Sequence, residues 1–240
     1  RSKPYTFIYL FPYMNPNERF IDLKPIQVTT PENSMLSFSW VVEPDTKYAP
    51  HRWKTDVVIP DSEKAQELVV KLDDFLTSFK KAIVVAYPDK SKEELKELIK
   101  WNKLPYSFGP YLDKEGKKRQ GFPDDNYLIL STNKKTLSYD GKKQNSPPII
   151  FDSSQKEPLN DQQKQKYKQI GPGTTAQVAI FVSQYQKEVG SGLRLTPAAI
   201  KIKNFIPFGS QAQTAEEWGF QQDEAPQQGS GTPTASDFDF

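Results

Sequence analysis

The residues of this chain that are best suited to chemistry are lysines and arginines that stand beside aromatic side chains. The mixture occurs in three segments, "KYAPHRWK", "PYSFGPYLDKEGKKR" and "FVSQYQKEVGSGLR". Ammonium and guanidinium groups neutralise phosphates, and aromatic rings offer faces on which nucleobases stack, each stacked base being worth roughly 1–3 kcal/mol. The pattern favours binding of a single-stranded nucleic acid, while plain solvated charge remains the alternative for each lysine cluster.

Tyr185 is the strongest single candidate for stacking. It ends a predicted strand on the polar face of that strand, and Lys187 and Arg194 flank the hairpin that follows. Phe181 lies two residues earlier on the same face. The other candidates share a basic or aromatic side chain in a predicted loop or on an outward strand face: Tyr48, Arg52, Lys54, Tyr106, Phe108, Tyr111, Lys117, Lys118, Arg119, Lys134, Lys135, Lys201 and Lys203.

Packing accounts for some of these aromatic residues as well as binding does. Trp53 shares its predicted strand face with aliphatic residues, which indicates a core position. Tyr106, Phe108 and Tyr111 either stack bases or pack a long loop. Phe181 either extends a row of stacking residues or packs under a helix.

Catalytic signatures are missing from the sequence. There is no cysteine and one histidine, so thiolate zinc sites, cysteine nucleophiles and multi-histidine metal sites are excluded. The motifs of nucleotide-hydrolysing and metal-dependent enzymes are not found. A nuclease would need converging carboxylates, and Asp113, Asp124 and Asp125 fall in predicted loops where turn formation explains them. We expect a non-enzymatic protein without cofactor or metal.

Charge is segregated along the chain. The formal net charge is +2, yet the segment after Lys203 holds six carboxylates and no lysine or arginine, so the body up to Lys203 carries +8. A basic body suggests a polyanionic partner. The segment from about Gly209 is rich in Gln, Gly, Ser, Pro and Thr, and its composition predicts a disordered tail that ends in "TASDFDF".

Hydrophobic periodicity predicts the elements that must position these residues. In "MLSFSWVVE", alternation places Leu36, Phe38, Trp40 and Val42 on one strand face. Apolar residues at spacings of three and four predict a helix from about Ser62 to Ala86. The remaining predicted elements are a strand at 52–59, a short helix opened by the capping-box pair Ser91 and Glu94, and strands at 127–132, 149–152, 174–185 and 193–205.

Many short strands with a long inserted helix predict a mainly β fold. An OB-fold barrel of five or more strands, with the long helix after the second barrel strand, is the leading architecture, and a β-sandwich is the alternative. The expected boundaries are an N-terminal extension at 1–30, with an extra strand in "PYTFIYLFPYM", a barrel domain at 31–208 and a flexible acidic tail at 209–240. No apolar run approaches the ~20 residues of a membrane span and no signal peptide is evident, so we expect a soluble intracellular protein.

Three features together resemble the single-stranded DNA-binding proteins of short-tailed bacteriophages and related bacterial viruses. They are "EPDTKYAPHRWKTDVVIP" leading into the long helix, "YQKEVGSGLRL" with an aromatic residue before a glycine-containing hairpin, and the acidic tail that closes on Asp-Phe. Together the three features cover roughly residues 35–208 and the tail, and it is their order along the chain that carries the resemblance. Residues 1–30 extend beyond the resemblance, and the tail is sparser in acid than is usual in that family.

The resemblance implies an OB-fold that coats single-stranded DNA in replication and recombination, in the cytoplasm of an infected bacterial host. It also implies that the tail, with Asp237, Phe238, Asp239 and Phe240 at its tip, contacts a replicative DNA polymerase and a helicase-primase, mediates a homodimer, and occupies the DNA groove when DNA is absent. Two alternatives stay open from the residues alone, a single-stranded RNA-binding protein and a protein–protein adaptor with an apolar patch.

Overall fold

The structure, a computed structural model, describes residues 21, 23–98, 101–122, 126–138, 141–187 and 190–209. The chain divides into two units, residues 1–210 and 211–240, and the described residues belong to the first. The strand expected in "PYTFIYLFPYM" and nearly all of the expected tail lie outside the described residues. Within the described ranges, no helix has the length and apolar content needed to cross a membrane.

The described elements are eight strands and a few helices, and those that were predicted lie close to their predicted bounds. The strands at 26–29 and 106–109 and the short helix at 161–164 were not predicted. The strands are β1 (Ile26–Thr29), β2 (Met35–Asp45), β3 (Arg52–Pro60), β4 (Tyr106–Gly109), β5 (Tyr127–Lys135), β6 (Ile149–Asp152), β7 (Thr174–Lys187) and β8 (Gly190–Asn204). The helices are α1 (Glu63–Ala86), α2 (Lys92–Leu98), α3 (Asp161–Lys164) and a single 3₁₀ turn at Gln165–Tyr167.

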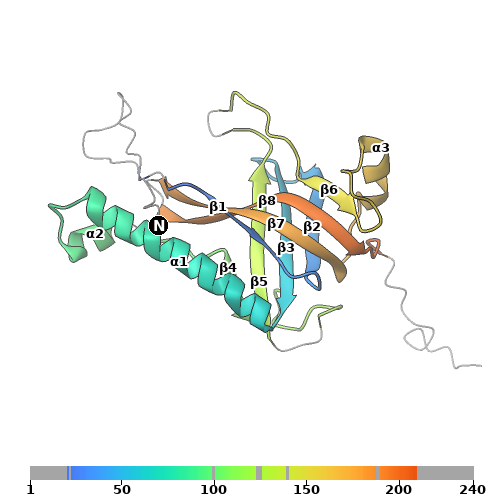
Figure 1. Ribbon diagram of the computed structural model, residues 1–240, viewed down its shortest axis with the longest axis horizontal. Helices are drawn as coiled ribbons and strands as arrows, with labels where there is room; N and C mark the ends of the chain where they lie inside the picture. The colour runs from blue at the N-terminus through green and yellow to red at the C-terminus, as the bar shows by residue number, and fades with distance from the viewer. Residues whose placement is uncertain are drawn as a thin grey trace, which may run out of the picture. The chain divides into compact units, whose positions relative to one another are not determined.

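The strands form one curled sheet in the order β4-β5-β3-β2-β7-β8-β6, with β1 paired to β7 beside this path. β2 pairs with both β3 and β7, β3 pairs with β5, and β5 comes close to β8 on the far side, so the sheet bends back on itself (Figure 1). This is the connectivity of an OB-type barrel built from β2, β3, β5, β7 and β8. The predicted fold is confirmed, with α1 inserted after the second barrel strand.

Helix α1 forms for the reason that the sequence suggested. Its buried positions recur at spacings of three and four, from Leu68 through Leu72 and Phe79 to Ile83, and they join the main core. The side chain of Ser62 caps the first turn by accepting a hydrogen bond from the Ala65 N–H at 3.3 Å. The helix contacts β1 and β7, and Figure 1 shows it running obliquely below these strands.

Helix α2 begins with the predicted capping box. The Ser91 N–H donates to Glu94 Oε2 at 2.7 Å, and the Glu94 N–H donates to Ser91 Oγ at 3.2 Å. The hydrogen bond from the Ser91 N–H, followed by the Ser91 side chain, lowers the pKa of the Glu94 carboxyl below its ordinary value. Strand β1 falls in the segment expected to be an extension, yet it pairs with β7 from Ile26 opposite Val182, so the sheet already begins there.

The face prediction for β2 is wrong, because the strand contains a bulge. Leu36 and Val41 are buried, whereas Phe38 and Trp40 are 49% and 46% exposed. The pairing with β3 shifts register between Ser37 and Trp40, and Phe38 takes a positive φ of 49°. A bulge inserts an extra residue and reverses the alternation beyond it. Strict alternation therefore placed both aromatic rings on the same face as Leu36, which is buried, although the bulge turns them outward.

Candidate nucleic-acid interface

The outer side of β2, β3 and β5 carries a cluster of aromatic and basic side chains. Register places Trp40 opposite Lys54, Lys54 opposite Asn133, and Arg52 opposite Lys135. Because partners in an antiparallel pair point to the same side of a sheet, these side chains share one surface. We call it the platform face and define it by Phe38, Trp40, Arg52, Lys54, Asn133 and Lys135. In OB-folds, this side of the second and third barrel strands is the surface that binds oligonucleotides.

Phe38 is the most unusual residue of the platform face. A bulky residue with positive φ is a backbone outlier, and such strain costs on the order of 1–3 kcal/mol and clusters at functional sites. The strain serves to present the ring, since nearly half of the side chain is exposed. The guanidinium carbon of Arg119 lies 4.4 Å from the ring centroid, a stacked cation–π contact. The structure therefore places an exposed aromatic ring and a guanidinium next to each other on the platform face.

Arg119 is fixed by its own loop. Its backbone N–H donates to the Tyr111 carbonyl oxygen at 3.0 Å, and its Nε donates to the Leu112 carbonyl oxygen at 2.9 Å. The guanidinium also lies 5.2 Å from the Tyr111 ring centroid. Arg119 was predicted as a phosphate contact, and the loop holds it over the platform face in a position suited to that role.

Tyr111, predicted as a stacking residue, is 5% exposed and is therefore not an open platform. Its hydroxyl donates to Asp56 Oδ2 at 2.8 Å, and its ring packs edge-on against Phe122 with centroids 4.9 Å apart. Burial, followed by the charge of Asp56, raises the pKa of Tyr111. Ser131 Oγ donates to the other Asp56 oxygen at 3.1 Å. Tyr111 thus anchors the loop that carries Arg119 to the middle of the platform face.

The loop between β2 and β3 borders the platform face and supplies Tyr48. This residue is 70% exposed, and the ammonium of Lys47 lies 5.4 Å from its ring centroid, as a stacking residue at the rim of a basic surface would be placed. Lys54 pairs with Asp45 at 2.5 Å. The hydrogen bond from Lys54, with a second from the Lys47 N–H, lowers the pKa of Asp45.

Several other predicted residues do not reach the platform face. Lys134 lies opposite the buried Trp53 in the register, and burial lowers its pKa, so it faces away from Lys135. Tyr106 is half-buried and donates a hydrogen bond to Asp73 on α1, which removes it as an open platform. Burial, and then this hydrogen bond, raises the pKa of Tyr106. Phe108 is 41% exposed, on edge strand β4.

The tip of the 110–122 loop carries two predicted lysines. Lys117 forms an exposed ion pair with Glu115 at 3.1 Å, and such pairs contribute little to stability. Lys118 forms an isolated backbone bridge with Leu112. Asp113 accepts hydrogen bonds from the Glu115 and Lys117 N–H groups at 2.8 and 2.9 Å, so its side chain stabilises the turn at this tip.

The predicted residues of β7 and β8 lie on a second surface, the outer side of this ribbon. Phe181 is 44% exposed and pairs with Thr196. Two residues further along β7, Ser183 pairs with Arg194. Lys201 and Lys203 also point outward, Lys203 forming an ion pair with Glu32 at 3.4 Å. The side chain of Lys187 and the tail residues Asp237 to Phe240 lie outside the described part.

Tyr185 is far from the platform face. It is ten residues along β7 from Thr175, where β7 pairs with β2, which corresponds to about 33 Å of strand. Its hydroxyl accepts a hydrogen bond from Asn102 Nδ2 at 2.9 Å, and its ring lies against Gly192, where a Cβ would be 3.0 Å from the hydroxyl oxygen. Arg194 lies 5.8 Å from the ring centroid. The ring is thus held at the outer end of the ribbon.

Sequence reasoning missed Phe38, Trp40 and Trp101. Trp101 is 39% exposed, packs edge-on against Phe79, and has the Lys80 ammonium 5.5 Å from its centroid. Phe38 and Trp40 gave no local signal, because strict alternation places them on the face of Leu36 and turns Ser37 and Ser39 outward, whereas both serines are buried. Among the described residues, no three His, Asp or Glu side chains group as metal ligands would.

Comparison with solved structures shows the same fold in two phage proteins. The first is gp2.5, a single-stranded DNA-binding protein encoded by bacteriophage T7, with a TM-score of 0.56 and 16% identity over 88% of this chain and all of that chain. The second is the single-stranded DNA-binding protein from bacteriophage Enc34, in complex with single-stranded DNA, with a TM-score of 0.52 and 11% identity over 76% of this chain and 89% of that one. No family model and no curated protein matches the sequence.

Proposed function

We propose that this protein binds single-stranded DNA without sequence preference, through stacking on Phe38 and Trp40 and phosphate contacts from Arg119, Arg52 and Lys54. The observation that carries the proposal is the strained backbone that presents the Phe38 ring beneath a guanidinium on the oligonucleotide-binding side of an OB-type barrel. Two proteins of the same fold are named as single-stranded DNA-binding proteins, and one is solved with the DNA bound.

The wider role that we propose is the coating of viral DNA during replication and recombination, without enzymatic activity. The tail tip would recruit the replicative polymerase and helicase-primase, and it would compete for the platform face when DNA is absent. The basic body and the acidic, aromatic end of the chain support this part of the proposal by charge complementarity. Removal of residues 210–240 is expected to leave DNA affinity unchanged or raised and to abolish partner binding.

Titration of fluorescent oligo-dT at two salt concentrations tests the proposal. We expect a linear log–log salt dependence with a slope near −0.7 per phosphate contacted. Phe38→Ala should weaken binding by about 1–3 kcal/mol, whereas Val85→Ala, at an exposed position of α1, should not change it. An affinity that ignores both salt and Phe38 would overturn the proposal. A matched RNA oligomer, in the same titration, decides between DNA and RNA.

A further inference from the structure

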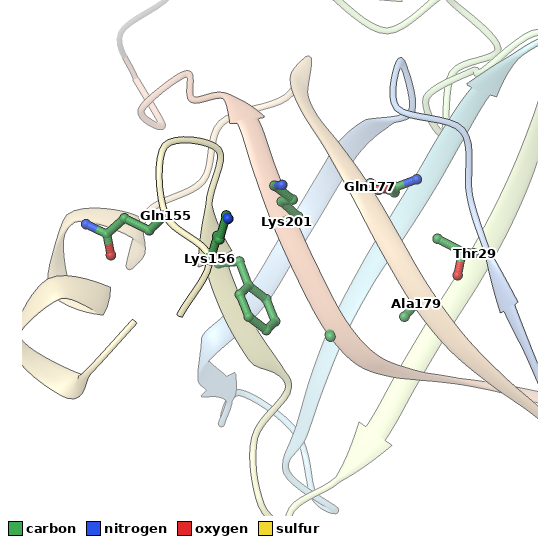
Figure 2. A pocket seen from close by; sticks show the side chains of 8 residues that line it. Thr29, Gln155, Lys156, Gln177, Ala179 and Lys201 are labelled. Carbon is green, nitrogen blue, oxygen red and sulfur yellow. The ribbon is translucent and has the colours of Figure 1, made fainter. Parts of the chain in front are cut away.

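A hollow of about 360 Å³ lies on the outer side of the β1-β7-β8-β6 part of the sheet, and none of its lining residues comes from the strands of the platform face. Figure 2 shows it with Thr29, Gln177 and Ala179 on one side and Lys156 and Lys201 on the other. Its volume lies within the range of pockets that hold small organic ligands. No residue of the platform face lines this hollow.

The hollow exists because small residues face each other across three strands. Thr29 on β1 pairs with Ala179 on β7, which pairs with Ala199 on β8. Successive outward side chains on a strand stand about 6.6 Å apart, so the next row on each side borders the floor. One of these rows contains Phe181, and the other contains Lys201.

The border rows provide rings and donors. Phe151 on β6 is the register partner of Lys201 on β8, and both side chains line the hollow. Gln177 pairs with Lys201 from the other side and adds an amide. Phe181, in the opposite border row, is 44% exposed and adds a second ring within the length of one or two nucleotides.

The charge of the hollow is one-sided. Lys156 and Lys201 line it and no carboxylate does. Among the described residues, neither lysine has an ion-pair partner, although Lys203, nearby on the same strand, is paired with Glu32. Two ammonium groups without a counter-ion over a floor of small side chains constitute a site for an anion with a flat, partly apolar body.

We propose that this hollow binds one or two nucleotides of a single strand, as a second contact outside the platform face. Lys156 and Lys201 hold phosphates, Phe151 and Phe181 contact bases, and Gln177 hydrogen-bonds a base edge or sugar. The inference rests on the proposed function and extends it: a strand long enough to leave the platform face continues on the outer side of β7 and β8. An acidic peptide would satisfy the lysines but would leave this amide and the two rings without a role.

The test compares a short and a long oligo-dT on the full chain, of about 6 and about 30 nucleotides, since one OB-fold covers roughly 4–16. The variants are Lys156→Ala with Lys201→Ala, and Ala179→Leu, which fills the floor and keeps both charges. Lys64→Ala with Lys71→Ala, at exposed positions of α1, is the charge-matched control.

We expect both hollow variants to bind the short oligomer like the unmodified protein and the long one at least about fivefold more weakly, the lower end of one stacked base. The double lysine variant should also lower the salt slope for the long oligomer by about 1.4, which is two phosphates at about 0.7 each. The control should change neither quantity.

Three results would overturn the second site. These are an equal loss for both oligomer lengths, a loss that the control reproduces, and unchanged binding of the long oligomer. A peptide of residues 231–240 that binds the unmodified protein but not the lysine variant, and that DNA does not displace, would overturn the nucleic-acid occupant in favour of an acidic peptide. Failure of the proposed function is distinguishable, because neither oligomer would then bind the unmodified protein.

Discussion

Replacing Phe38 by glycine and, in a second variant, by alanine separates the strain of the backbone from the function of the ring. Both substitutions remove the ring, so both should weaken oligo-dT binding by the contribution of one stacked base, about 1–3 kcal/mol. Both also remove the cation–π contact of Arg119, worth roughly 0.5–1 kcal/mol at an exposed site. In these two respects the variants should be indistinguishable.

Their stabilities should differ, and in an unusual direction. Within an ordinary strand, glycine is less stable than alanine by roughly 0.5–1 kcal/mol, because it loses more backbone entropy on folding. At the φ of 49° seen here, alanine retains a left-handed penalty of about 1–2 kcal/mol that glycine does not have. The free energy of unfolding of the glycine variant should therefore exceed that of the alanine variant, by up to about 1.5 kcal/mol.

Urea unfolding followed by circular dichroism measures the free energy of unfolding. Fluorescence anisotropy with oligo-dT measures the affinity for DNA. Trp40→Ala is a useful companion, because it removes a neighbouring exposed ring without a positive φ. An alanine variant more stable than the glycine variant would show that Phe38 is not held in the left-handed region. Unchanged oligo-dT affinity in both variants would show that the ring is not a platform.

Three further predictions concern the scaffold. Tyr167→Phe removes the hydrogen bond that is the largest cause of the lowered pKa of Asp152. A carboxylate with a lowered pKa stabilises the fold above its unfolded pKa of about 3.9, so the variant should lose about 1–2 kcal/mol of stability at pH 7. In urea titrations this difference from the unmodified protein should shrink below about pH 4. Tyr111→Phe leaves Asp56 without one hydrogen-bond partner and should cost about 1–2 kcal/mol of stability. It should also weaken DNA binding, because Tyr111 holds the loop that carries Arg119. A gel-shift with unchanged affinity would argue that Tyr111 does not anchor this loop. Gly171→Ala would place a Cβ 2.7 Å from a backbone carbonyl oxygen and should lower the thermal midpoint, by a free energy of about 1–3 kcal/mol.

Much of the fold was predictable because its signals are local. The apolar stripe of α1 and the capping box of α2 depend on residues three and four apart, and both elements form where they were predicted. The strands at 127–135 and 149–152 also match, and Trp53 is buried as its strand face indicated. These features need no knowledge of the partner strand.

The candidate site was less predictable because its geometry depends on long-range contacts. The positive φ of Phe38 opposes the intrinsic preference of that residue, so only the assembled sheet can impose it. Tyr111 is buried among residues that are distant in the sequence, since it packs with Val58 and donates a hydrogen bond to Asp56. Lys134 and Lys135 point to opposite sides because they are consecutive residues of β5, but only the register with β3 decides which of them shares the side of Arg52.

The pairing of the first described strand with the seventh has a consequence for how the chain folds as it is made. Ile26 pairs with Val182, and Met35 pairs with Thr175, so the barrel cannot close until most of the described chain has left the ribosome. Contacts this distant in sequence slow folding, because a long loop must be ordered before it is stabilised. Until then the hairpin of β2 and β3 has a free edge and α1 has an uncovered apolar stripe. The nascent chain should therefore depend on ribosome-bound chaperones more than its modest size suggests.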